Sequence, residues 1–361
     1  MMERQPLEGD AVVFCAGAYR TPNGKTAHGL VRRTRRYRVN SVIDEASAGQ
    51  DAGMLLDGQD RNIPVFSHLS EALDHAIKAG HPLTHFVIGL APDGGRLAQE
   101  HRESVKEAIH AGLHVDSGLH DFLTEDLEIS SLAQKLGVRL RDVRKPPDRK
   151  DLHFFTGKIE EVDSLKIAIL GTDSAIGKRT TAWILMDALQ ARGLKVELIG
   201  TGQTAWMQGA QFGIILDSLI NDFVSGEIEH AVWMAWKEKK PDIIIIEGQG
   251  SLMNPAYPGG FEILAAGRPD AVVLQHAPKR KDYDGFPGYP LHPLDRQIQA
   301  ITILSNKPVA AVTINNEHMK ADEVEETCRI IQRDTGIPAA DLLLQNPDPI
   351  VRAILSFLKS K

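Results

Sequence analysis

Residues 171–181 read GTDSAIGKRTT and have the residue types and spacing of a phosphate-binding loop. They follow the apolar run at 165–170, so the sequence predicts a strand, a glycine-bearing turn and a helix in that order. Such a turn directs backbone N–H groups and the positive end of the helix dipole at one anion, and Lys178 adds a point charge. We predict a nucleotide-like ligand on Gly171, Thr172, Asp173, Ser174, Ala175, Ile176, Gly177, Lys178, Arg179, Thr180 and Thr181.

This loop departs from the common G-x-x-x-x-G-K-[ST] form at two positions. Thr172 stands at the first glycine position, and Arg179 stands where serine or threonine is expected. Thr180 or Thr181 must then supply the hydroxyl for Mg²⁺, and we assign Thr181 to the metal. The alternative is an ordinary strand-to-helix turn that contains Gly-Lys.

A carboxylate ends a second apolar run, at residues 242–246. Glu247 is therefore our second predicted metal ligand, because a buried central strand of a P-loop domain delivers an acid to the phosphate site in this way. The small and amide residues that follow, Gly248, Gln249 and Gly250, allow a ligand to approach the carboxyl end of the sheet, and we predict that they bind substrate.

Hydroxyl and amide groups follow another strand, at residues 196–199. Thr201, Gln203 and Thr204 are spaced by Gly200 and Gly202, and they suit an anionic or amide-bearing substrate. We predict that these three residues bind substrate. A plain glycine turn is the alternative.

Strands that alternate with helices must position these groups. In the first half, strands are predicted at 11–15, 38–43, 84–88, 113–116 and 140–142, and helices at 69–79 and 98–111. This alternation predicts a Rossmann-like domain with a mostly parallel sheet, although residues 17–22 lack the G-x-G-x-x-G fingerprint. In the second half, the remaining strands are predicted at 195–199, 242–246, 271–274 and 309–314.

The stretch KPPDRK at 145–150 is the best linker candidate, because consecutive prolines stand among charges. We place the domain boundary there. The predicted fold class is therefore α/β, with a Rossmann-like domain at 1–150 followed by a doubly wound, P-loop NTPase-like domain at 151–361.

Composition restricts the classes of function. The net charge of −7 over 361 residues argues against a nucleic-acid partner. Cys15 and Cys328 are the two cysteines, and they suggest neither a disulfide framework nor a zinc site. Residues 1–10 lack the apolar core of a secretory signal, and no run of about 18 apolar residues could span a membrane. We expect a cytoplasmic protein without a membrane partner.

The motifs together resemble those of the D-glutamate N-acetyltransferase (DgcN)-like family, long recorded as a conserved domain of unknown function. The resemblance lies in SGLH at 117–120, DVR at 142–144, the P-loop with Thr181, TGQT at 201–204, IEGQGSL at 246–252, His276 and YPL at 289–291. The stretch RTPNGKTAHG at 20–29 departs from the family segment, so the chain looks like a sister branch and its acceptor substrate stays open.

The resemblance implies a Rossmann-like domain, a P-loop domain and acyl transfer from acetyl-CoA to the amine of a small amino acid. We also expect a homo-oligomer. The amine must lose a proton before it attacks, and a neutral histidine with an ordinary pKa of about 6.5 suits that task. The candidates are His28, His120 and His276. Residues 279–281 resemble a family segment with basic residues near the site.

A second resemblance leaves two alternatives open. GTDSAIGK at 171–178 is similar to the P-loop of dethiobiotin synthetase, and EGQG at 247–250 is similar to that enzyme's E-G-x-G segment. This implies Mg-ATP-dependent activation of a carboxylate by a ligase or kinase, with Lys178, Thr181 and Glu247 on the phosphates and metal. A non-catalytic protein gated by a nucleotide could use the same site.

Overall fold

The computed structural model describes residues 6–358 and divides the chain into two compact units. The N-terminal unit comprises Met1–Pro146 and Gln203–Ala210, and the P-loop unit comprises Pro147–Gly202 and Gln211–Lys361. Of the N-terminal stretch considered above, residues 1–5 lie outside the described residues. None of the described helices has both the length and the apolar character needed to cross a bilayer.

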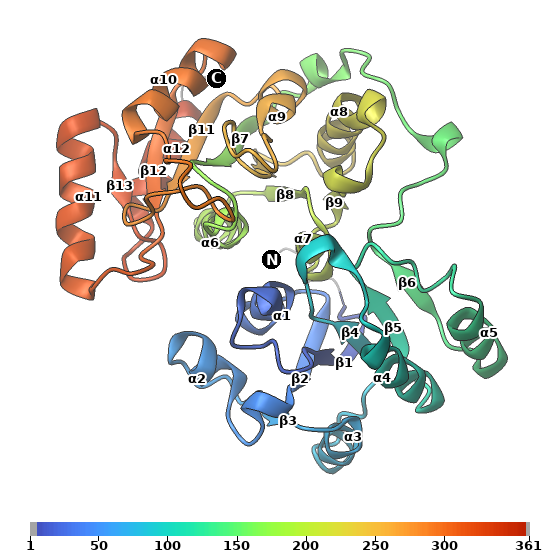
Figure 1. The fold of residues 1–361 in the computed structure, drawn as a ribbon. Coiled ribbons are helices and arrows are strands. Elements are labelled where there is room, and N and C mark those ends of the chain that lie inside the picture. Colours follow the sequence, from blue (N-terminus) through green and yellow to red (C-terminus); the bar gives the residue numbers. More distant parts are fainter. Residues whose placement is uncertain (1–5, 359–361) are drawn as a thin grey trace. The chain divides into compact units, whose positions relative to one another are not determined.

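The N-terminal unit is built on a six-stranded parallel sheet in the order β3-β2-β1-β4-β5-β6 (Figure 1). This is the strand order of a Rossmann fold. The strands are β1 (Gly9–Phe14), β2 (Tyr37–Ile43), β3 (Val65–Phe66), β4 (His85–Ile88), β5 (His114–Ser117) and β6 (Leu140–Asp142). The helices are α1 (Lys25–Arg32), α2 (Ala52–Asp57), α3 (Leu69–Lys78), α4 (Gln99–His110), α5 (Leu127–Leu136) and α7 (Gln203–Met207).

Alternation along β1 separates the two cores of this unit. Val12 and Phe14 pack with α3, α4 and α5, whereas Ala11 and Val13 pack with α1, α2 and Met207 of α7. Both faces of the sheet are thus covered by helices, which is the arrangement that βαβ units produce.

The P-loop unit has a seven-stranded parallel sheet in the order β13-β12-β11-β7-β10-β8-β9. Its strands are β7 (Leu165–Gly171), β8 (Val196–Gly200), β9 (Phe212–Gly213), β10 (Ile243–Glu247), β11 (Ala271–His276), β12 (Val309–Ile314) and β13 (Ala339–Ala340). Its helices are α6 (Lys178–Gln190), α8 (Asn221–Lys239), α9 (Phe261–Ala266), α10 (Leu294–Ser305), α11 (Ala321–Thr335) and α12 (Asp348–Leu358). Two parallel-sheet α/β units confirm the predicted fold class.

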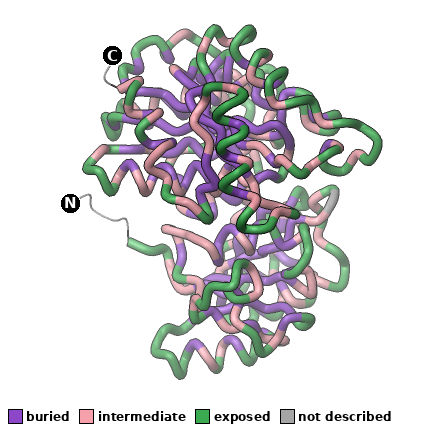
Figure 2. Tube along the Cα trace, turned by 90° about the vertical axis from the view of Figure 1, so that its left-hand side faces the viewer, coloured by how far each residue is buried: buried purple, intermediate pink, exposed green. Residues whose placement is uncertain are grey.

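The central strands of the P-loop unit are continuous apolar runs because both of their faces are covered. All residues of β7, β10 and β12 are buried, and the buried segments of each unit lie in its interior (purple in Figure 2). Residues of α8, α9 and α10 pack on one face of this sheet, while α6 and α12 contact β7, β10 and β12. Burial on both faces explains why β10 reads IIIIE rather than alternating with polar residues.

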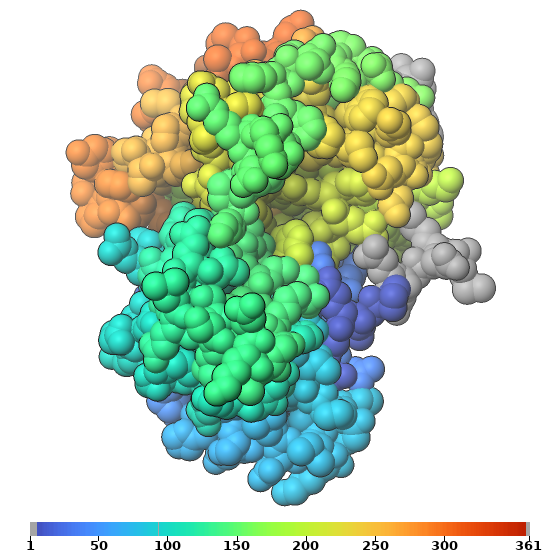
Figure 3. Space-filling view, turned by 90° about the vertical axis from the view of Figure 1, so that its right-hand side faces the viewer, coloured from blue at the N-terminus to red at the C-terminus, as the bar shows by residue number. Residues whose placement is uncertain are grey.

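The chain passes from the first unit to the second between Pro146 and Pro147. After that point, residues 147–164 run over the surface of the P-loop unit (green in Figure 3) and are held there by α8. Glu229 of α8, which is 2% exposed, accepts hydrogen bonds from the backbone N–H groups of Thr156 (2.6 Å) and Ile159 (3.2 Å). The linker segment is therefore part of the folded P-loop unit.

The short helix α7 was not predicted as part of the N-terminal unit, because it follows β8 in the chain. It belongs there by its contacts. The Trp206 ring lies under the guanidinium groups of Arg36 (3.6 Å) and Arg141 (4.3 Å), and the hydroxyl of Thr204 lies 3.0 Å from that of Thr26 in α1. Stacked arginines and a buried hydroxyl pair thus fix this segment to α1, to the residue before β2 and to β6.

Candidate functional site

Strand β7 brings the predicted phosphate-binding loop to the centre of the P-loop unit's sheet, where its neighbours are β10 and β11. The loop passes through positive φ at Ala175 (52°) and Gly177 (99°), and α6 begins at Lys178. The first turn of a helix has backbone N–H groups with no partner inside the helix. The loop therefore has the strand, turn and helix start that a P-loop uses to hold phosphate.

Lys178 points back into the loop rather than out to solvent. Its ammonium donates to the carbonyl oxygens of Asp173 (2.8 Å) and Gly250 (2.6 Å), and the residue is 7% exposed. Burial lowers the pKa of Lys178 to about 8, against the opposing effect of the carboxylates of Asp173 and Glu247. The lysine is thus a charge that is only partly compensated in the free protein, which favours an anionic ligand.

Asp173 organises the loop and is completely buried. Its Oδ1 accepts from the N–H of Ser174 (2.7 Å) and the amide of Asn254 (2.8 Å). Its Oδ2 accepts from Arg280 (2.8 Å) and from the N–H of Asp284 (2.8 Å). One carboxylate therefore joins the P-loop to the loops that follow β10 and β11, so its side chain is a scaffold for the phosphate-binding backbone.

Arg280 is the basic residue of the 279–281 segment that reaches the P-loop. Its Nη1 also donates to the carbonyl of Ser174 (2.8 Å), while Nε and Nη2 donate to the two carboxylate oxygens of Glu317 (2.7 and 2.9 Å). Lys279 instead pairs with Glu323 at 3.0 Å on the surface. The guanidinium is held from both sides and fixes the loop after β11 against the P-loop.

Glu247 lies at the end of β10, next to β7, and is 4% exposed. Its Oε2 accepts from the N–H of Thr201 (2.9 Å), and the Thr201 hydroxyl donates to the carbonyl of Glu247 (3.1 Å). Burial raises the pKa of Glu247, although the positive charges of Arg179 and Lys178 oppose this shift. The structure thus brings Glu247, Thr201 and the P-loop cations together.

Two glycines after Glu247 are required by close packing. A Cβ on Gly248 would lie 2.3 Å from the carbonyl oxygen of Ile169, and a Cβ on Gly250 would lie 2.1 Å from that of Tyr257. Gly250 also has a φ of 51°. The backbone here can therefore approach β7 and present the Gly250 carbonyl to Lys178 only without side chains.

A polar atom next to the loop lacks a partner. The hydroxyl of Ser251 is buried and makes no hydrogen bond to any described residue. With Gly171, Gln249 and Gln297 it lines a small enclosed space beside the P-loop. The space is too small to hold a water molecule, so the hydroxyl stays without a partner in this packing.

His276 ends β11, and its Nδ1 lies 3.0 Å from the hydroxyl of Thr172 in the P-loop. Burial lowers the pKa of His276 to about 4. The imidazole is therefore neutral at physiological pH. We chose His276 as a candidate base on the ordinary histidine pKa of about 6.5, and its pKa in the structure is lower than that.

The other two candidate histidines belong to the N-terminal unit. His28 of α1 has its Nε2 2.5 Å from the carbonyl oxygen of Tyr19 and stacks edge-on against the Tyr19 ring. His120 is exposed, and its backbone N–H donates to Gly95 at 2.6 Å. The three histidines thus have three different environments, and only His276 contacts the P-loop within its own unit.

The predicted substrate-binding group is divided between the two units. Thr201 bonds to Glu247 in the P-loop unit, whereas Gln203 and Thr204 lie on α7 and are buried in the N-terminal unit. Gln249 is half-buried beside Gly202 in the P-loop unit. A single glycine-spaced stretch of sequence therefore supplies residues to both units.

A P-loop domain is typical of nucleotide binding with Mg²⁺, so we tested whether the predicted metal ligands fit that ion. The hydroxyl of Thr181 donates to Oε1 of Gln275 (2.5 Å), which also accepts from Thr313 (2.5 Å). The described residues contain no cluster of three or more histidine, cysteine or acidic side chains that could hold a metal. Glu247 fits the role of a carboxylate near the ion, but Thr181 is already used in a bond between α6 and β11.

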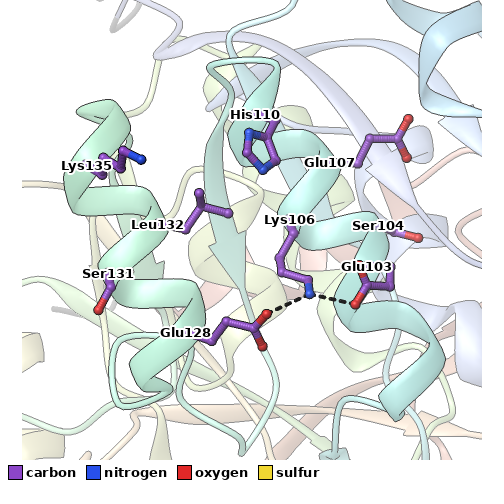
Figure 4. Close-up of a pocket in the computed structure, with 9 residues that line it drawn as sticks. All are labelled: Glu103, Ser104, Lys106, Glu107, His110, Glu128, Ser131, Leu132 and Lys135. Carbon is purple, nitrogen blue, oxygen red and sulfur yellow. Dashed lines mark hydrogen bonds and ion pairs between the residues drawn. The ribbon is translucent and has the colours of Figure 1, made fainter.

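A surface groove of about 760 Å³ lies between α4 and α5 of the N-terminal unit (Figure 4). Figure 4 shows the Lys106 ammonium between the carboxylates of Glu103 (2.6 Å) and Glu128 (2.8 Å). Both glutamates are more than half exposed. These are solvated ion pairs, which contribute little, and we assign the groove no part in the function.

Sequence reasoning missed several residues of the site, of which Asn254, Asp284 and Gln275 matter most. They have no motif spacing of their own. They meet the P-loop and the start of α6 because Gln275 lies in β11, and Asn254 and Asp284 follow β10 and β11, the neighbours of β7 in the sheet. The positions at which β10 and β11 end were the available signal, because loops at the carboxyl ends of adjacent parallel strands share one edge.

Comparison with known proteins places the chain among relatives of the same two-domain organisation. Residues 153–351 match the family model described as "Domain of unknown function (DUF1611_C) P-loop domain", and residues 45–146 match the DUF1611_N Rossmann-like domain. A crystal structure of a DUF1611 family protein from Anabaena variabilis ATCC 29413 has a TM-score of 0.88 and 27% identity, and the match covers 97% of this chain and all of that one.

Two curated relatives are named D-glutamate N-acetyltransferase. The protein from Pseudoalteromonas sp. is 32% identical over 272 residues, which is 74% of this chain and 80% of that protein. The protein from Tritonibacter scottomollicae is 30% identical over 261 residues, which is 71% of this chain and 76% of that protein. As the resemblance of its motifs predicted, this chain belongs to the DUF1611 family, together with these D-glutamate N-acetyltransferases.

Proposed function

We propose that this protein is an N-acyltransferase that binds acetyl-CoA through its P-loop and transfers the acetyl group to the amine of a small amino acid. The observation that supports it most is the position of Lys178, buried at the start of α6 between the carbonyls of Asp173 and Gly250. A lysine and helix N-terminus that converge in this way suit the phosphates of a CoA ligand. The names of the curated relatives support the acyl transfer.

The residues of the chain have three tasks in this reaction. The P-loop backbone and Lys178 hold the phosphates, and Asp173 keeps the loop in shape through its four donors. The bound thioester supplies the electrophilic carbonyl. A base takes one proton from the acceptor ammonium, and the amine nitrogen then forms the new bond to the carbonyl carbon. The carbon–sulfur bond breaks, and CoA leaves as the thiol after its sulfur receives the second proton lost by the nitrogen.

His276 is the base candidate that lies at the P-loop. Its neutral ring is ready to accept a proton, but its low pKa in the free protein makes it a weak base. Polyanionic phosphates beside it would raise that pKa toward the working range. His28 and His120 of the N-terminal unit are the other candidates.

The test is an acyl-transfer assay with purified protein, acetyl-CoA and a panel of D- and L-amino acids that begins with glutamate. Free CoA thiol and the N-acetylated product are measured together, the latter by mass spectrometry. The proposal expects equal amounts of thiol and product with at least one amino acid. Thiol release without product, or no turnover with any acceptor, would count against acyl transfer.

Glu247 favours one competing function, Mg-ATP-dependent activation of a carboxylate. A buried carboxylate beside a P-loop is suited to hold metal-bound water in such enzymes. The same panel with Mg-ATP in place of acetyl-CoA separates the two functions, because only the ligase or kinase forms ADP in proportion to substrate.

A further inference from the structure

The position after the P-loop lysine departs from a magnesium-binding loop. In the common motif this residue is serine or threonine, and its hydroxyl binds Mg²⁺. Here it is Arg179, in the first turn of α6. Thr181, the residue of the following Thr180-Thr181 pair that we assigned to the metal, donates its hydroxyl to Gln275 and so ties α6 to the end of β11.

The carboxylate expected beside the ion already has positive charges of the chain close to it. Oε2 of Glu247 accepts from the N–H of Thr201, and the charges of Arg179 and Lys178 act on this carboxylate. A guanidinium near this carboxylate carries the positive charge that a divalent ion supplies in other P-loop domains. The described residues offer no cluster of acidic and histidine side chains for a metal elsewhere.

Phosphate recognition by arginine needs no metal, because the guanidinium binds phosphate oxygens in a bidentate manner. A diphosphate such as that of CoA or ADP carries less charge than a triphosphate, and a P-loop with adjacent lysine and arginine can neutralise it directly. The same arginine would compete with Mg²⁺ for the oxygens between a β- and a γ-phosphate.

We infer that this P-loop binds its diphosphate ligand without a divalent cation, and that Arg179 takes the place of the magnesium ion. The inference rests on the proposed function in one respect, namely that the P-loop holds the diphosphate of CoA. It deepens that proposal by making the site selective for a metal-free diphosphate over a Mg-nucleoside triphosphate.

The experiment is calorimetric titration of the full chain with acetyl-CoA and, separately, with ADP, each in EDTA and in millimolar Mg²⁺. The wild-type dissociation constants are expected to agree within about twofold between the two buffers. Arg179→Ser should weaken binding in EDTA by about tenfold or more, since it removes a charged contact. Because it restores the hydroxyl of the common motif, Mg²⁺ should recover part of that loss.

Arg192→Ser is the matched control, because Arg192 follows α6, is 36% exposed and pairs with Asp348 away from the P-loop. It should bind like the wild type. Tightening of wild-type binding by tenfold or more in Mg²⁺, or normal binding of Arg179→Ser in EDTA, would overturn the inference. Metal-independent binding of ADP without any binding of acetyl-CoA would retain it and reject the proposed acyl donor, while binding of neither probe would reject both.

Discussion

Lys178 shows how burial prepares a single residue for an anion. Its pKa of about 8 lies below the ordinary value because the ammonium is desolvated, and it donates to two carbonyl groups rather than to a carboxylate. A bound phosphate would supply the missing negative charge. The cost of burying the lysine is only partly offset in the free protein and is offset further in the complex, so the residue favours the bound state over the free one.

The affinity for acetyl-CoA should therefore depend on pH. The pKa of Lys178 is lowered to about 8 in the free protein. Its protonated form, which binds the phosphates, is therefore present below about pH 8 and is lost above it. We expect the dissociation constant to be constant from about pH 7 to 7.5 and to rise by up to about tenfold per pH unit above 8. Lys178→Arg, which stays charged, should flatten this profile. A flat wild-type profile between about pH 7 and 9.5 would contradict the assigned role.

A second prediction at the residue scale concerns the contribution of Asp173 to stability. Asp173→Asn places an amide against donors and leaves Arg280 without one of its carboxylates, so the free energy of unfolding should fall by about 3 to 5 kcal/mol. Urea denaturation measures the change. Asp334→Asn is the control, because Asp334 is 55% exposed in its pair with Arg333 and should change stability by less than about 1 kcal/mol. A similar small change for both variants would refute the organising role of Asp173.

At the scale of elements, the close approach of β7 and β10 sets the position of the P-loop relative to Glu247. Gly248→Ala would force its Cβ against the backbone carbonyl of Ile169. A strand backbone cannot move aside as easily as the end of a flexible side chain. We expect a loss of about 1 to 3 kcal/mol in the free energy of unfolding. In the control Gly202→Ala, the nearest atom is the movable amide of Gln249, and the loss should be smaller. Equal losses in the two variants would show that the close contact between Gly248 and Ile169 does not determine the stability of this region.

Helix α7 gives a prediction for the N-terminal unit. Trp206→Ala removes the ring that two arginines cover, so amide hydrogen exchange of residues 203–210 should accelerate about tenfold or more. The control is Trp233→Ala in α8, whose ring lies under Lys158 and Lys237 in the P-loop unit. It should leave exchange at 203–210 unchanged. Unchanged exchange in Trp206→Ala would mean that the arginine stack does not hold α7.

The long strands were predictable because their apolar runs are unambiguous. The predicted strand at 309–314 coincides with β12, and that at 140–142 with β6. The two-residue edge strands β9 and β13 were missed, since so short a pairing leaves no pattern. Residues 214–223 have helical spacing, but they form only a short 3-10 helix at Leu216–Ser218 before α8 begins at Asn221, and Leu216 packs into the core.

At the scale of the whole molecule, the sequence motifs predicted the central residues of the site but not the distant residues that contact them. The P-loop, Glu247 and Thr201 could be named in advance because each follows a recognisable strand. Arg280 and Asn254 reach Asp173 from 107 and 81 residues away, and such contacts follow from the order of strands in the sheet rather than from spacing. The assignment of α7 to the N-terminal unit is equally a property of the fold, since it depends on partners in α1, before β2 and in β6.

The central claim is that the P-loop holds the acyl donor, and Lys178→Ala tests it most directly. The measurement is the rate of N-acetylated product with acetyl-CoA and the best acceptor, together with the dissociation constant for acetyl-CoA. Lys195→Ala, which removes an exposed lysine of the same unit, is the control. We predict that Lys178→Ala folds but loses binding and turnover by about a hundredfold or more, while the control keeps both. Wild-type binding and turnover in a folded Lys178→Ala protein would contradict the account.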